Sequence, residues 1–191
     1  MAKKKNVEKD INIQYDEPLS INDFINNSYK EYCLYVLKQR AIPSYIDGFK
    51  VVQRKLICAA LDMAHTKKIK VAELGSALSS YEYLHGEVSA QDALTKMTAS
   101  WSNNMPLFEE HGNFGSRIVQ EPAASRYIYV KLSENFKKFF DDFEVCEEKE
   151  DNPEPVNYLP IIPMSLVNGI SGMAIGFATN ILPRNVNDIV L

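Results

Sequence analysis

The sequence predicts an α+β fold in which short, closely spaced helices are followed by a glycine-rich segment of short strands. Three observations support this prediction. Apolar residues recur at helical spacing between Ile21 and Trp101, alternate as in a strand at Tyr127–Leu132, and are interrupted by glycines and prolines after Tyr158. The chain has 191 residues, of which 46% are hydrophobic, so a sizeable core can form without disulfides.

The first helix is expected over Ile21–Gln39. Ser20 and Asp23 form a variant of the capping box at its start, and the Ala41-Ile-Pro-Ser turn ends it. The polar residues 1–19 are expected to form a flexible arm. Further helices are expected over residues 51–65, 71–79, 87–101 and 134–140. Short helices joined by tight turns, with bases at one end, are typical of a helix-turn-helix domain.

The residues that follow extend this domain and then change in character. Residues 103–115 are rich in turn formers and precede the strand at 127–132, which predicts a β-wing after the helices. The predicted winged-helix domain therefore spans residues 20–145. An acidic linker at 146–157 separates it from an apolar, glycine-punctuated platform at 158–191.

The net charge of −4 conceals two segments of opposite sign. Residues 30–70 contain nine bases against three acids (+6), whereas residues 141–155 contain one base against eight acids (−7). Because screening at physiological salt limits charge interactions to about 8 Å, the basic segment can bind phosphates in spite of the acidic total. The acidic segment is expected to be a solvated loop.

Several functional classes are disfavoured by the residues present. Three widely spaced cysteines do not form a disulfide framework or a zinc ribbon and fit a reducing cytosol, and three histidines lack metal-site spacing. Gly169–Gly176 lacks the Gly-Lys-Ser/Thr ending of a phosphate loop. No apolar run reaches the roughly 18 residues of a membrane span, and Met1–Asp10 lacks the apolar core of a signal peptide.

Three stretches are informative together: Arg40–Lys55, Tyr83–Glu87, and His111–Ser116 followed by Ala123–Tyr127. In these motifs, their order and their spacing, the chain resembles the breakage–reunion subunit of type IIA DNA topoisomerases, the gyrase A-like family. The resemblance extends to about Asn185 and is most like the medium subunits of T4-type phages. It implies a winged-helix DNA-cleavage domain followed by the start of an α/β tower, the remainder of which belongs to another chain or to a longer form of this one.

The resemblance also implies a reaction. The chain is expected to be the DNA-cleavage and religation portion of an ATP-dependent type II topoisomerase, with Tyr127 as the nucleophile that forms a transient 5′-phosphotyrosine. A phenol with an ordinary pKa of about 10 is a weak nucleophile at neutral pH, so neighbouring groups must stabilise the phenolate and the transition state. Arg126, His85 and Arg40 are the residues implied for this task.

Further residues are implied to bind DNA or drugs. Lys50, Gln53, Arg54, Lys55 and Lys131 are expected DNA contacts, and Met173 takes the place of an isoleucine that wedges between base pairs. In bacterial members, quinolones bind through a water–metal bridge to a serine and an acid. The corresponding residues here are Val88 and Asp92.

The sequence has no ATPase motif and no toprim-type cluster of a glutamate with Asp-x-Asp, so no metal ligands are assigned to it. Mg²⁺ is expected to be held mainly by a partner's toprim domain, and ATP to be used by a partner domain. The expected partners are double-stranded DNA, large subunits carrying those domains, and a second copy of the chain, with no membrane involved. The expected location is the cytoplasm, at the nucleoid of a bacterial host. The alternative is a non-catalytic winged-helix DNA-binding module or a structural fragment.

Overall fold

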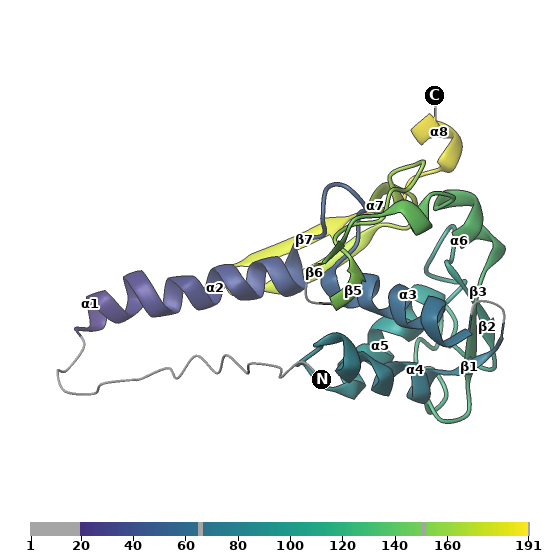
Figure 1. Cartoon of the computed structure of the whole chain (residues 1–191), viewed down its shortest axis with the longest axis horizontal. Coiled ribbons are helices and arrows are strands. Elements are labelled where there is room, and N and C mark those ends of the chain that lie inside the picture. The colour runs from purple at the N-terminus through teal and green to yellow at the C-terminus, as the bar shows by residue number, and fades with distance from the viewer. Residues whose placement is uncertain (1–19, 65–66, 150–151, 191) are drawn as a thin grey trace, which may run out of the picture.

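The protein folds into a helical body from which a long helix and a β-hairpin project side by side, as the computed structural model shows (Figure 1). The structure describes residues 20–64, 67–149 and 152–190. The expected arm at residues 1–19 and the expected helix end at His65 lie outside these ranges. The predicted mixture of helices and short strands is confirmed.

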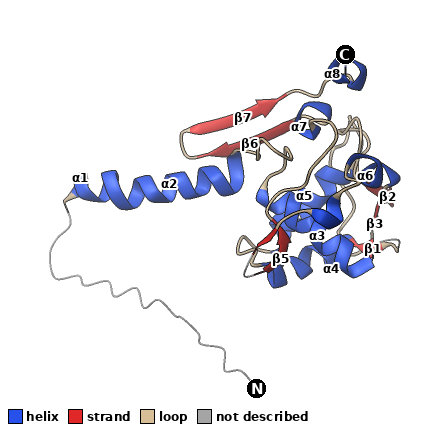
Figure 2. Cartoon of the chain, turned by 45° about the horizontal axis from the view of Figure 1, so that its top comes forward, coloured by secondary structure: helices blue, strands red, loops and turns tan. Residues whose placement is uncertain are grey.

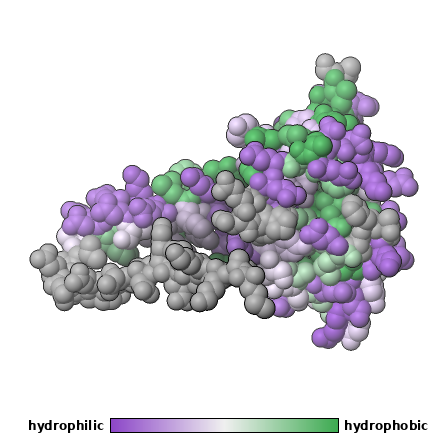
Figure 3. All heavy atoms as spheres, in the orientation of Figure 1, coloured by the Kyte–Doolittle hydropathy of each residue, from purple (hydrophilic) through white to green (hydrophobic). Residues whose placement is uncertain are grey.

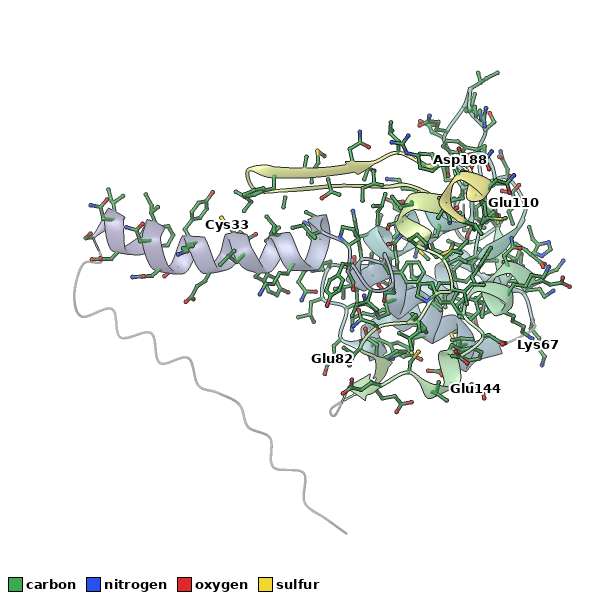
Figure 4. The ribbon with its side chains drawn as sticks, turned by 90° about the horizontal axis from the view of Figure 1, so that it is seen from above. Cys33, Lys67, Glu82, Glu110, Glu144 and Asp188 are labelled. Carbon is green, nitrogen blue, oxygen red and sulfur yellow. The ribbon has the colours of Figure 1, made fainter. Side chains whose placement is uncertain are left out.

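One continuous helix runs from Ile21 to Ala41, slightly past the predicted end at Gln39. Its segments alternate between α- and π-helical hydrogen bonding: Ile21–Asp23 (α1), Phe24–Tyr29 (η1), Lys30–Val36 (α2) and Leu37–Ala41 (η2). The Ser20 hydroxyl accepts a hydrogen bond from the Asp23 N–H at 3.3 Å, so the predicted N-cap is confirmed. Figure 4 shows Cys33 on the projecting part of this helix, whereas Ala41 at its end is buried in the body.

The body is built from Val51–Ala64 (α3), Val71–Ala77 (α4), Leu78–Tyr81 (η3) and Glu87–Thr98 (α5). Leu56, Leu74 and Leu94, one from each α-helix, are completely buried in a common core. Helix α5 ends before the predicted Trp101. The Asn103 side-chain amide donates to the carbonyls of Lys96 and Ala99 at 2.7 and 2.9 Å, which satisfies backbone groups at the helix end.

A three-stranded antiparallel sheet closes one end of the body. Its strands are Ile69–Lys70 (β1), Phe108–His111 (β2) and Tyr129–Leu132 (β3), in the order β1-β3-β2. Strand β3 begins later than predicted because Tyr127 lies in a turn, its N–H bonded to the Ala124 carbonyl at 2.9 Å. Val130 and Leu132 of β3 point into the core, as the alternation of a strand requires.

The segment after the sheet differs from its prediction in one respect. Glu134–Phe139 (α6) forms as expected, and the Ser133 hydroxyl before it donates to the Pro106 carbonyl at 3.0 Å. The segment predicted as a solvated acidic loop contains Phe143–Val145 (η4) and a hairpin of Glu148–Lys149 (β4) with Asn152–Pro155 (β5). Glu154 of that hairpin is completely buried.

The last part of the chain carries the projecting hairpin. Its elements are Met164–Val167 (α7), Ile170–Ala174 (β6), Phe177–Ile181 (β7) and Val186–Val190 (α8). Strands β6 and β7 lie beside the long helix, so that residues far apart in sequence share one arm of the molecule (Figure 2). Figure 3 shows hydrophobic residues gathered around α8 and mainly hydrophilic residues over the opposite end of the body.

Candidate nucleic-acid interface

A cavity of about 920 Å³ lies where the long helix, the start of α3, helix α5 and the β6–β7 hairpin meet. Its charged lining residues are three bases and one acid: Arg40, Lys50, Lys96 and Asp92. His85 and Gln53 also line it. Burial and the neighbouring charge of Lys96 lower the pKa of Lys50. The cavity is therefore a cationic recess, suited to the phosphates of a nucleic acid backbone.

His85 faces this cavity from the turn before helix α5. The turn needs a left-handed backbone at Glu82 and Gly86, with φ of 58° and 84°. The imidazole meets the Tyr83 ring edge-on, with centroids 5.3 Å apart, and the Tyr83 hydroxyl is hydrogen-bonded to that of Ser89 at 3.0 Å. The orientation of His85 is thus set by a tyrosine that is itself attached to helix α5.

Lys50 and Gln53 open helix α3. The Lys50 N–H donates to the Gln53 side-chain oxygen at 2.8 Å, and the Lys50 ammonium donates to the Ser171 carbonyl of β6 at 2.5 Å. Gln53 therefore supplies half of a capping box in addition to lining the cavity.

The structure places two of the expected phosphate contacts inside the fold. Arg54 is 6% exposed and pairs with the buried Asp47, the two groups being 2.8 Å apart. Lys55 is 6% exposed and pairs with the buried Glu154 at 2.6 Å. Both cations are held by carboxylates inside the fold, so neither is available to a DNA phosphate in this conformation.

Tyr127 and Arg126 lie on a fixed loop outside the cavity. The carbonyls of Ser125 and Ile128, on either side of the pair, accept the Ala72 and Val71 N–H groups at 3.2 and 3.1 Å. The start of helix α4 thereby anchors the loop. The Tyr127 side chain is 68% exposed, and the Arg126 guanidinium lies 5.0 Å from the centre of its ring. An exposed phenol beside a cation is accessible to a phosphodiester.

The other expected residues lie in three places. Met173 on β6 is 82% exposed and does not line the cavity. Lys131 on β3 is half-buried and pairs with Glu109 at 3.5 Å, which leaves it at the sheet surface. Val88 and Asp92 stand one turn apart on helix α5, and both line the cavity.

Lys96 is a cavity residue that the sequence reasoning missed. A signal for it exists, because Val88, Asp92 and Lys96 follow one another at intervals of four and therefore share a helix face. Ser171 was also missed, and it has no such signal, because only its backbone carbonyl takes part.

Within the three described ranges, no group of three His, Cys, Asp or Glu side chains is placed to hold a metal ion. In the same ranges, no helix combines the length and the apolar character needed to cross a bilayer.

Comparison with known proteins gives the class of this fold and site. Residues 40–191 match the family model of the DNA gyrase/topoisomerase IV A subunit. A crystal structure of the Plasmodium falciparum topoisomerase II DNA-binding, cleavage and re-ligation domain superposes with a TM-score of 0.77 at 32% identity, covering 90% of this chain and 25% of that one. The chain belongs to the family of DNA gyrase and topoisomerase IV A subunits.

Individual relatives come from phage, yeast and bacteria. The DNA topoisomerase medium subunit of Enterobacteria phage T4 is 47% identical over 175 residues, which are 88% of this chain and 39% of the relative. DNA topoisomerase 2 of Candida glabrata is 39% identical over 90% of this chain and 13% of its own length. The DNA gyrase A subunit of Spiroplasma citri is 34% identical over 90% of this chain and 80% of its own length. The chain thus spans well under half of the first two relatives.

Proposed function

We propose that this chain is the DNA-cleavage and religation portion of an ATP-dependent type II DNA topoisomerase. The observation that carries the proposal is the exposed, anchored Tyr127 next to Arg126, in a chain of this family that also presents a cationic cavity. In this proposal, residues 20–145 act as a winged-helix domain and residues 158–191 as the start of a tower. In the same proposal, residues 1–19 form an N-terminal arm and residues 146–157 form the linker between the two parts.

The proposed reaction exchanges one phosphodiester for another. The Tyr127 phenol gives up its proton and its oxygen attacks the phosphorus. The bond to the 3′ oxygen breaks and that oxygen takes up a proton, so a 5′-phosphotyrosine and a free 3′-hydroxyl result with no net change in protons. Arg126 and Arg40 stabilise the charge on the phosphoryl oxygens, and His85 supplies a proton or a hydrogen bond near the leaving oxygen. Resealing is the reverse of this step, so the energy of the broken bond is retained.

A double-strand break needs two nucleophiles, which is why the proposal includes a second copy of the chain. Its support is that Tyr127 does not line the cavity formed by Arg40 and His85 in one copy. Membership of this family supports assigning Mg²⁺ and ATP to the toprim and ATPase domains of partner subunits in this proposal. The phage relative supports action at the nucleoid of a bacterial host.

DNA contacts are proposed from the cavity and its rim. Arg40, Lys50 and Lys96 supply cations for backbone phosphates, and the exposed Met173 is the wedge that opens a base step and bends the duplex. Lys131 retains a proposed DNA contact at the sheet surface, where its pairing with Glu109 is half exposed. Arg54 and Lys55 are left out of this set because they are buried.

The nucleophile is tested by trapping covalent complexes. Denaturing the reconstituted complex with detergent on labelled plasmid is expected to leave DNA attached to this chain, and Tyr127→Phe is expected to abolish that attachment while binding stays nearly intact, because only a hydroxyl is removed. Tyr129→Phe is a matched control, since Tyr129 is also exposed in the same segment. Covalent DNA on the Tyr127→Phe variant would show that another residue is the nucleophile. Absence of covalent DNA from the wild type would favour a non-catalytic DNA-binding module instead.

A further inference from the structure

A lysine side chain joins the projecting hairpin to the start of helix α3. The Lys50 ammonium, at the start of α3, donates to the Ser171 carbonyl of β6 at 2.5 Å. The two residues are 121 positions apart in the chain. Lys50 as a residue is half-buried, its bond to Ser171 is exposed to solvent, and it also lines the cationic cavity. One ammonium therefore touches the hairpin and the proposed DNA surface at once.

Gly172 allows strand β6 to approach Lys50 and the end of the long helix closely. An added Cβ at this position would lie 2.8 Å from the Ala41 carbonyl oxygen, a distance that real Cβ atoms essentially never show, and 3.1 Å from Lys50 Cε, which is a tight contact. Strand β6 thus rests directly on the lysine and on the end of the long helix. Any larger residue at Gly172 would push the strand away from both.

The backbone of Lys50 is itself immobilised. Its N–H donates to the Gln53 side chain at 2.8 Å, and its carbonyl accepts the Gln53 and Arg54 N–H groups at 3.1 and 3.2 Å. These bonds make Lys50 the first residue of the hydrogen-bonded frame of α3. The hairpin is therefore attached to a rigid element through a half-buried side chain.

Met173 is the residue whose position depends on this attachment. It follows Gly172 in β6, pairs with Ala178 of β7, and is 82% exposed. Because side chains alternate along a strand, Met173 points away from the face that rests on Lys50. The contact beneath Gly172 thus determines how far Met173 stands out from the body.

We propose that Lys50 is a positioning residue for the DNA wedge, which rests on the proposed function through the role of Met173. An ammonium has three N–H donors, and the bond to Ser171 uses one of them. The others serve a backbone phosphate in the same cavity, so occupation of the cavity and the position of the hairpin are linked. Lys50 then controls the bend of the duplex as well as the affinity for it.

The attachment is tested first without DNA, by hydrogen–deuterium exchange on the full-length protein. Lys50→Met is expected to raise exchange in the backbone amides of 170–181. Lys96→Met is the matched control, because it removes the same charge from the same cavity and Lys96 is not bonded to the hairpin in the described structure. Unchanged exchange at 170–181 in the Lys50→Met variant would overturn the proposal.

The second test measures the bend of an end-labelled duplex by energy transfer at saturating protein, in the complex with the partner subunits. Lys96→Met is expected to weaken binding and reduce the slope of log K against log salt by about 0.9, with the bend retained. Lys50→Met is expected to lose bend even at saturation. Gly172→Ala, which keeps every charge, is expected to lose bend in the same way. Wild-type bend in both Lys50→Met and Gly172→Ala would mean that Lys50 only binds phosphate.

The variant Met173→Ala separates a failure of the proposed function from a failure of the positioning role of Lys50. If Met173→Ala bends DNA as the wild type does, the wedge assignment is wrong, and the exchange experiment still decides whether Lys50 holds the hairpin. If Met173→Ala loses the bend while Lys50→Met keeps it, the wedge stands and the positioning role of Lys50 falls.

Discussion

Asp47 is the single residue on which the packing around the basic segment depends most. It is completely buried and accepts hydrogen bonds from the Phe49 N–H, from the Arg54 guanidinium and from the Tyr158 N–H, at distances between 2.8 and 3.1 Å. It therefore joins the turn before α3, helix α3 and the start of the C-terminal segment. Tyr158 in turn completes an aromatic cluster with Phe49, Phe136 and Phe140.

The substitution Asp47→Asn is expected to lower the free energy of unfolding by about 3–5 kcal/mol, because it leaves the Arg54 guanidinium buried without its counter-charge. The asparagine side chain also places an NH₂ donor where the carboxylate accepted hydrogen bonds from Phe49, Arg54 and Tyr158. Urea denaturation followed by far-ultraviolet circular dichroism measures the change. Glu134→Gln is the control, since the Glu134–Lys138 pair is exposed and 4.0 Å apart, and it is expected to leave the midpoint unchanged. A midpoint for Asp47→Asn equal to that of the control would contradict this account.

Helix α5 is the element that presents a row of three side chains to the cavity. Val88, Asp92 and Lys96 share its cavity face, so the helix presents a methyl pair, a carboxylate and an ammonium in successive turns. If this face corresponds to the quinolone site of bacterial relatives, it supplies the acid at Asp92 but no hydroxyl at Val88. Val88 is 71% exposed, so a substitution there meets little packing resistance.

We expect weak quinolone response in the wild type and about a fivefold or larger increase in quinolone-stimulated cleavage for Val88→Ser, because a second anchor of the water bridge contributes about 1 kcal/mol or more. Titration of covalent complex with the drug provides the measurement. Val145→Ser makes the same chemical change at an exposed site outside the cavity and controls for it. An intercalating poison is expected to act equally on the wild type, Val88→Ser and Val145→Ser. Equal quinolone sensitivity of the wild type and Val88→Ser would show that Val88 is not an anchor position.

At the scale of the whole molecule, two cysteines report on different parts of the structure. Cys58 in helix α3 is 5% exposed, and burial, followed by the charge of Asp62, raises the pKa of its thiol to about 12. Cys33 lies half-buried on the long projecting helix, outside the main core. The body and the projecting arm can therefore be followed separately in one reaction.

With iodoacetamide at pH 8, Cys33 is expected to be alkylated in the native protein, and Cys58 only when the body unfolds. The physical reason is that the thiolate is the nucleophile, and a raised pKa together with burial removes it from Cys58. Peptide mass spectrometry over a urea series measures both rates in the same sample. Native labelling of Cys58 as fast as that of Cys33 would show that helix α3 opens without global unfolding.

The helices and the sheet were largely predictable because they depend on local patterns. Periodic apolar residues and the Ser20 cap predicted the long helix to within a few residues, and alternation predicted strand β3. The motif at Ala123–Tyr127 pointed to Tyr127 as the candidate nucleophile, but alternation placed this tyrosine in the strand, whereas the structure has it in an exposed turn before β3. The end of α5 was missed because the Asn103 side chain, beyond the helix, decides where it stops.

The amino-acid sequence by itself determined which elements form, where bases gather along the chain, and which family the chain resembles. Only the tertiary structure decided which of those bases are free. Arg54 and Lys55 belong to the basic segment of the sequence, yet carboxylates 7 and 99 residues away hold both of them in the interior. Lys50 is held by a carbonyl 121 residues away. Periodicity is a local property, whereas the partner of a buried charge is selected by the packing of distant segments, because an unpaired charge in the interior is too costly to keep.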